Sequence, residues 1–293
     1  MKGFIKTILA FIIINISVLV GISLIFYILS LFWIHVNAQN NLLLYSIIVG
    51  SFSSIISLLL SPWIIKRTYN IYFVWEDITD DDPKISYLKK RIDDFAEKYW
   101  YKIKMWIYES SEPNAFAAGC GLCWWYMVAF STWILEIMDL DELDWVLWHE
   151  LSHIYNQDVV LITILQSFLD IFVIYISHIL SSLFSDSEEN NGFSWFLVII
   201  FETIFWIIAS IILAFISRKR EFKADYYSAT KFSSKQNMIK ALKELKDISS
   251  NYTIEEDNRL ASLKFNNFST KNLYYLFSTH PKLEERIKKL ESI

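Results

Sequence analysis

Long apolar segments alternate with polar segments along this chain. Residues 7–34 and 42–65 are almost wholly apolar, and two further apolar segments follow at 159–184 and 193–217. Each is long enough to supply the roughly 20 residues that a membrane-spanning helix needs. The pattern therefore predicts four membrane-spanning helices, arranged as two hairpins. The first segment is too long for the apolar core of a secretory signal, which has about 7–15 residues.

Basic residues mark one side of both hairpins. Residues 1–6 contain two lysines, residues 66–67 read Lys-Arg, and residues 218–220 read Arg-Lys-Arg, whereas the connector at 35–41 has no Lys or Arg. Short segments rich in Lys and Arg stay on the cytoplasmic side of a membrane. The sequence thus predicts an integral membrane protein with both termini in the cytoplasm.

The polar parts of the chain have the pattern of a water-soluble domain. Within residues 68–158, apolar residues recur at helical spacing, which predicts an amphipathic helix with one buried face; these are Ile85, Leu88, Ile92, Phe95 and Tyr99. Residues 102–108 and 125–131 are rich in β-formers and predict two strands, separated by turns at Pro113 and at 119–121. Residues 218–293 are again polar and predicted to be mainly helical. A small sheet beside helices, in two cytoplasmic parts, is therefore expected.

A histidine pair lies at the end of the first polar part. Residues 148–154 read W-H-E-L-S-H-I, which places His149 and His153 on one face of a helix, where neutral imidazoles bind Zn²⁺. Glu150 beside them can act as a general base on the attacking water. Chance is the alternative explanation, but the chain has only 5 His. We therefore expect one zinc ion per chain and a zincin-like domain.

The third ligand is expected after the second hairpin. Residues 221–225 read E-F-K-A-D directly after the basic end of the last apolar segment, on a helix that begins at the membrane surface. The hairpin returns Glu221 to the level of the two histidines, and two His with one Glu form a catalytic, gluzincin-type set. Asp225 would accept a hydrogen bond from the outer ring N–H of a ligand histidine. Without the histidine pair and the hairpin, Glu221 and Asp225 could equally be surface charges at the start of a helix.

Several other polar residues leave alternatives open. Asp170 and Glu202 lie inside apolar segments, where they line a hydrated cavity used by substrate or serve helix packing. His280 could donate a hydrogen bond to an oxyanion or only cap a helix. Cys120 and Cys123 are too few to fill a zinc shell. The net charge of -5 and the absence of a basic stripe give no support for nucleic-acid binding.

Four segments together resemble the HtpX family of membrane metalloproteases, with the zinc-dependent CAAX prenyl proteases as more distant relatives. The segments are P-N-A-F-A at 113–117, H-E-L-S-H-I-Y-N-Q-D at 149–158, R-K-R-E-F-K-A-D at 218–225 and T-H-P-K-L-E-E-R at 279–286. The resemblance implies a zinc endopeptidase of the bacterial inner membrane that cuts misfolded or damaged membrane proteins at the cytoplasmic face, in protein quality control under stress. It implies zinc ligation by His149, His153 and Glu221, and catalysis by Glu150.

The resemblance also implies roles outside the metal-binding residues. It makes a substrate cleft of Asn114, Ala115, Phe116 and Ala117, and raises His280 and Arg286 to active-site candidates, with Arg286 among the residues that bind substrate. Two other functions stay open: a protease specific for prenylated CAAX peptides, and a non-catalytic membrane scaffold that kept the fold, which would have no need of Glu150. Polypeptides and the lipid bilayer are the expected partners.

Two departures from the family pattern concern single residues. Lys223 stands where many members have histidine, at a position that is not a ligand. The chain has 12 Trp against 6 Gly. Three tryptophans stand where the family typically has glycine: Trp133, Trp145 and Trp206. A fourth, Trp148, stands where the family has a small residue. Because overpacking is destabilising, we hypothesise that some of these are glycines encoded by UGA; genuine divergence with repacking is the alternative.

Overall fold

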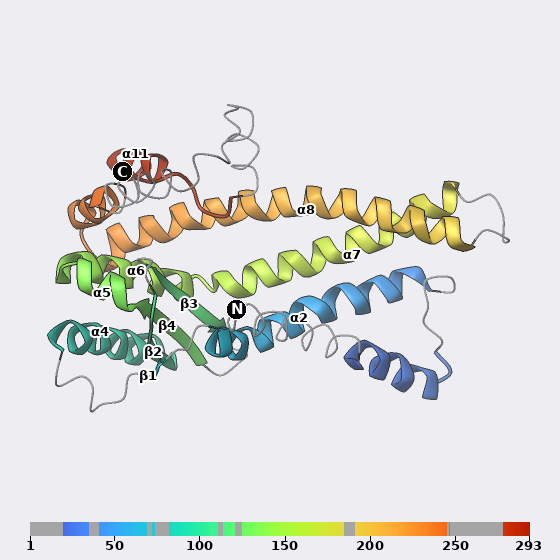
Figure 1. Cartoon of the computed structure of the whole chain (residues 1–293), viewed down its shortest axis with the longest axis horizontal. Helices are drawn as coiled ribbons and strands as arrows, with labels where there is room; N and C mark the ends of the chain where they lie inside the picture. The colour runs from blue at the N-terminus through green and yellow to red at the C-terminus, as the bar shows by residue number, and fades with distance from the viewer. Residues whose placement is uncertain are drawn as a thin grey trace, which may run out of the picture. The chain divides into compact units, whose positions relative to one another are not determined.

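The computed structural model describes residues 20–34, 41–68, 72–73, 82–110, 114–120, 125–184, 191–244, 246 and 278–293. The described chain is mainly helical and contains a four-stranded sheet (Figure 1), which confirms the predicted fold class. It divides into two compact units. The helical unit comprises residues 1–68 and 160–213, and the sheet unit comprises residues 69–159 and 214–293.

Long apolar helices build the helical unit. They are α2 (Leu42–Thr68), α7 (Asp158–Phe184) and α8 (Asn191–Tyr227), and residues 20–31 form a shorter apolar helix. Within the described ranges, three helices are long and apolar enough to cross a membrane. The segment predicted as the first span begins at residue 7 and so lies partly outside the described residues, as do most residues of the polar loop predicted at 185–192.

Small residues let α2 and α7 approach closely. A Cβ atom added to Gly50 of α2 would lie only 2.7 Å from the backbone nitrogen of Ile171 on α7, so a larger residue there would push the helices apart. Four residues further along α2, the Ser54 hydroxyl donates a hydrogen bond of 3.0 Å to Asp170. Between α7 and α8, the Ser181 hydroxyl donates to the Ser194 carbonyl at 2.7 Å. Apolar packing and polar contacts therefore both hold these helices together.

The sheet unit contains four strands in the order β1-β2-β4-β3. These are β1 (Tyr72–Phe73), β2 (Ile103–Tyr108), β4 (Trp125–Ser131) and β3 (Ala115–Cys120). β2 runs parallel to β4, whereas β3 pairs antiparallel with β4, with Ala117 opposite Val128. β3 was not expected, since only turns were predicted between the two β-rich segments at 102–108 and 125–131. Its small residues and Gly119 have weak β-propensity, and pairing with β4 supplies the missing stabilisation.

Two helices pack on one another beside the sheet. α4 (Pro83–Tyr99) contacts β2, α6 (Leu140–Tyr155) contacts β3 and β4, and the two helices contact each other. The predicted apolar face of α4 is buried at Ile85, Leu88, Ile92 and Phe95. Asp82 caps the start of α4, and Trp100 ends it in a left-handed conformation. The sheet thus gives α6 a rigid base.

α8 differs from its predicted boundaries. We expected a separate helix to begin near Glu221, but α8 continues unbroken from Asn191 to Tyr227 and then passes into a π-helical turn, Ser228–Phe232. No proline and no glycine occurs between Phe193 and Tyr227, so nothing in the sequence ends the helix at the change from apolar to basic residues. A single rigid helix therefore carries Glu221 and Asp225.

The tryptophans at unusual positions have different surroundings. Trp148 is buried, its indole N–H donates to Asp144 at 3.0 Å, and its ring stacks on Phe232. Trp145 is equally buried, but its indole nitrogen has no hydrogen-bond partner within the described part of the chain. Trp206 is largely exposed. An unpaired buried N–H is costly, so Trp145 is the position at which the glycine hypothesis gains most support.

Mass spectrometry of peptides from the protein made in its native host tests the hypothesis. We expect glycine mass at one or more of positions 133, 145 and 206. Tryptophan mass at all three would refute recoding and would mean that the packing evolved around tryptophan.

Candidate metal centre and active site

α6 sets the positions of the two histidines. The helix begins with a capping box, in which Asp139 and Glu142 each accept a hydrogen bond from the other's backbone N–H. Its apolar face is buried against the sheet, including Leu143, Leu147 and Leu151. His149 and His153 lie one turn apart, and their Nε2 atoms are 3.3 Å from each other. The folding of one short helix therefore brings together two potential metal ligands.

Glu221 approaches the same point from α8. Its carboxylate oxygens lie 3.5 Å from His149 Nε2 and 3.4 Å from His153 Nε2. One ligand atom from each of the three residues lies within 4.8 Å of the others. His149 and Glu221 are buried, and the side chain of His153 is only 13% exposed. The three residues predicted as ligands thus meet at one site within the sheet unit.

The spacing of these atoms suits a small tetrahedral ion. With ligand distances of about 2.0–2.2 Å, the ligand atoms of tetrahedral zinc lie roughly 3.3–3.6 Å from one another. The separation of 3.3 Å between the two imidazole nitrogens falls in that range. The two oxygens of the Glu221 carboxylate each lie within it of one imidazole nitrogen, Oε1 at 3.4 Å from His153 Nε2 and Oε2 at 3.5 Å from His149 Nε2. Two imidazoles and a carboxylate are also the ligand types of a catalytic zinc site with an open fourth position. The residues present therefore fit a zinc ion.

Asp225 and Arg286 hold the first histidine. Asp225 lies one turn after Glu221 on α8, and its Oδ1 is 2.9 Å from His149 Nδ1. Arg286 of α11 (Leu283–Glu291) donates two hydrogen bonds to the Asp225 carboxylate, at 2.6 and 2.8 Å. Both side chains are buried. This contact fixes the imidazole with Nε2 facing the metal position.

The contacts of Arg286 differ from those expected of a residue that binds substrate. Its side chain is only 9% exposed and its guanidinium binds Asp225, so the contacts favour a role in orienting His149. The sequence could not show this, because 61 residues separate the two partners.

Asp158 and Arg220 hold the second histidine, a role that the sequence analysis did not assign. Asp158 Oδ2 is 2.7 Å from His153 Nδ1, and Arg220 Nε lies 3.4 Å from Asp158 Oδ1. Gln157 adopts a left-handed conformation with φ of 56°, which separates the end of α6 from Asp158 at the start of α7. Burial alone would lower the pKa of His153, but the hydrogen bond to Asp158 and the contact with Glu221 raise it to about 10. The sequence did contain a signal for this role, since Asp158 follows the predicted ligand His153 by five positions.

The Asp158→Asn variant tests this role. An amide cannot supply the charge that favours the N–H on His153 Nδ1, so we expect metal affinity to fall about 10–100-fold. The measurement is competition for zinc against a chromophoric chelator, with exposed Asp141→Asn on α6 as the matched control. Unchanged affinity of Asp158→Asn would show that His153 does not depend on this carboxylate.

Glu150 and β3 lie beside the predicted ligands. Burial raises the pKa of Glu150, and the group is also affected by a backbone hydrogen bond from Ala117 on β3. Asn114, the residue before β3, is tied to Ser131 of β4 by two hydrogen bonds of 2.9 and 3.0 Å. β3 is an edge strand in the described sheet. Residues 114–117, predicted as the substrate cleft, thus form a strand edge next to the predicted base.

His280 lies at the rim of the site. Its side chain is 70% exposed, and its Nδ1 is 3.1 Å from Glu221 Oε2. Arg218 donates a hydrogen bond of 2.6 Å to the Ser278 carbonyl, which fixes the backbone just before His280. Its role as an oxyanion donor stays a prediction. The side chains of both cysteines lie outside the described residues.

Known proteins are similar to this chain over most of its length. "Protease HtpX homolog" of Methylacidiphilum infernorum is 37% identical over 264 residues, covering 87% of this chain and 86% of the relative. "Protease HtpX" of Tolumonas auensis is 35% identical, covering 98% of this chain and 99% of the relative. The crystal structure of S. mikatae Ste24p shares the fold with a TM-score of 0.68 at 18% identity, covering 99% of this chain and 67% of that one.

The sequence pattern of peptidase family M48 matches residues 85–293, which include the histidine pair, Glu221 and Asp225. These similarities identify a membrane-embedded metalloprotease that acts on polypeptides. The resemblance recognised in the sequence is therefore confirmed. On its family match and on relatives aligned over nearly their full length, the chain belongs to peptidase family M48.

Proposed function

We propose that this protein is a zinc-dependent endopeptidase that cleaves misfolded or damaged membrane proteins at the cytoplasmic face of the bacterial inner membrane. The observation that carries the proposal is the meeting of His149, His153 and Glu221, with separations of 3.3–3.5 Å, beside Glu150. One zinc ion per chain fits this set. The basic residues that flank the apolar segments support the cytoplasmic placement.

The edge of β3 supports binding of an extended polypeptide. An edge strand has unpaired backbone N–H and C=O groups on which a peptide can add as a further strand. Ala117 on this strand lies within hydrogen-bond reach of Glu150. A peptide held along β3 would therefore present a peptide bond to the proposed base.

The mechanism is hydrolysis without a covalent intermediate. When bound, zinc would supply Lewis-acid activation of the water and the scissile carbonyl. Glu150 accepts a proton from the attacking water and delivers it to the leaving amine; its raised pKa suits both steps. Asp225 and Asp158 keep His149 and His153 oriented. His280 is the proposed donor to the oxyanion.

Cleavage assays on the purified full-length protein in detergent or proteoliposomes test the proposed function. We expect chelator-sensitive cleavage of an unfolded membrane protein that carries no lipid modification, restored by added zinc. Cleavage confined to a prenylated CAAX peptide would replace the proposal with the prenyl-peptide alternative. Cleavage that survives complete removal of the metal would contradict zinc dependence.

A further inference from the structure

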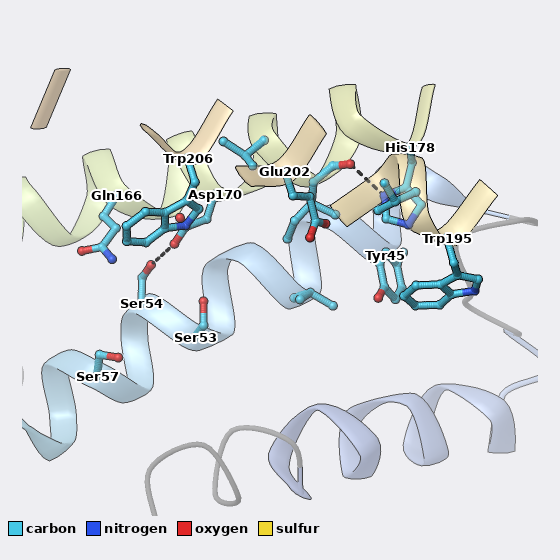
Figure 2. A pocket seen from close by; sticks show the side chains of 14 residues that line it. Tyr45, Ser53, Ser54, Ser57, Gln166, Asp170, His178, Trp195, Glu202 and Trp206 are labelled. Carbon is cyan, nitrogen blue, oxygen red and sulfur yellow. Dashed lines mark hydrogen bonds between the residues drawn. The ribbon is translucent and has the colours of Figure 1, made fainter. Parts of the chain in front are cut away.

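A polar cavity of about 480 Å³ lies among α2, α7 and α8 of the helical unit (Figure 2). It shares no residue with the metal centre. The polar groups that line it are two carboxylates, an imidazole, an amide and several hydroxyls: Asp170, Glu202, His178, Gln166, Tyr45, Ser53, Ser54 and Ser57. All of them lie in helices apolar enough to cross a membrane. So many polar groups at membrane depth are expensive unless a polar partner is present.

The cavity is rich in hydrogen-bond acceptors. Asp170 and Glu202 are half-buried and face the cavity (Figure 2), and no lining residue is a lysine or arginine. The Nδ1 atom of His178 donates to the Ile174 carbonyl at 2.9 Å.

Within the described part of the chain, the two carboxylates are only partly satisfied. Asp170 accepts one hydrogen bond, from Ser54 at 3.0 Å. Glu202 has no hydrogen-bond donor among the described side chains, although His178 lies near enough to influence it electrostatically. The cavity therefore offers carboxylate oxygens with free acceptor capacity, and no lysine or arginine of its own lining pairs with them.

The size of the cavity favours a side chain over a bare ion. A volume of about 480 Å³ is far larger than the roughly 30 Å³ that one water molecule occupies in the liquid. Lining residues on α7 extend from Gln166 to His178, which corresponds to about 18 Å along a helix. A cavity of this length can accept a long side chain from a neighbouring membrane-spanning segment.

We propose that this cavity binds a lysine or arginine side chain from a membrane-spanning segment of a polypeptide substrate, with Asp170 and Glu202 as the partners of its charge. The proposal rests on the proposed function and adds a substrate class. Basic residues within spans normally pair with acidic residues of their own assembly. A misassembled membrane protein leaves such a residue without a partner, and the cavity would recognise it.

Matched model substrates test the proposal in proteoliposomes containing the full-length protein. Each substrate has one leucine-rich span followed by the same unstructured tail, with either lysine or methionine at the centre of the span. We expect kcat/KM to be about tenfold higher or more for the lysine substrate, mainly through KM, because a desolvated charge pair contributes strongly to binding. The double variant Asp170→Asn/Glu202→Gln should remove this preference.

Two controls separate the possible outcomes. Phe168→Leu, at an exposed position of α7 outside the cavity, should keep the preference. A soluble unfolded polypeptide should be cleaved at the same rate by all three proteins, which also shows that the double variant is folded. Equal cleavage of both span substrates by the unmodified protein, or a lysine preference that persists in the double variant, would overturn the cavity proposal. Failure of the unmodified protein to cleave any of these substrates would instead contradict the proposed function.

Should the double variant not fold, the single variants Asp170→Asn and Glu202→Gln, assayed on the same substrate pair, decide the question. Each should reduce the lysine preference, and two folded single variants that retain all of it would contradict the proposal.

Discussion

Glu150→Gln is expected to lower kcat about 10²–10⁴-fold while the protein keeps its zinc. The amide has nearly the same shape as the carboxylate but cannot accept a proton from water. Glu150 is not one of the three residues whose side-chain atoms meet at the metal position, so metal content should not change. The measurement is cleavage of an unfolded polypeptide together with zinc content by elemental analysis.

Glu136→Gln is the matched control, because Glu136 is exposed on the short helix α5 (Thr132–Ile137). It should cleave like the unmodified protein. Full activity in Glu150→Gln would exclude general-base catalysis by this residue. Loss of zinc together with activity would show that Glu150 has a structural role instead.

Glu221→Ala is expected to abolish both zinc retention and cleavage. The variant removes one of three ligands and leaves two imidazoles, 3.3 Å apart, without the carboxylate that contacts both. A site with two protein ligands binds zinc far more weakly than one with three. Zinc should be lost during purification, and added zinc should restore little activity.

Lys223→Ala is the control for this variant, since Lys223 is exposed and only two residues away on α8. It should retain one zinc ion per chain. If Glu221→Ala also retained one tightly bound ion, the third ligand would have to be another residue; His280, whose Nδ1 lies 3.1 Å from Glu221 Oε2, is one candidate.

The sequence allowed the metal centre to be predicted where the determinants are local. Two histidines four residues apart meet whenever their segment is helical, so His149 and His153 needed only the pattern of α6. Glu221 could also be predicted, because a hairpin of two predicted membrane-spanning segments returns the chain to the side of the membrane on which the hairpin began. The same reasoning did not show that the second segment and Glu221 belong to one continuous helix.

Contacts between distant segments could not be predicted in the same way. Nothing in the sequence near Arg286 indicates that it binds Asp225, because that pairing depends on how α11 packs. The strand β3 was missed because its small residues become a strand only through pairing with β4. Asp170 and Glu202 were recognised as unusual, yet their shared cavity depends on the register of three helices.

X-ray absorption at the zinc edge of the purified Glu150→Gln protein tests the central claim most directly. We predict one zinc ion per chain with a first shell of two imidazole nitrogens and further oxygen atoms, as His149, His153 and Glu221 would provide. Sulfur in that shell, or purified protein that contains no zinc and cannot be loaded with it, would contradict the proposed metal centre.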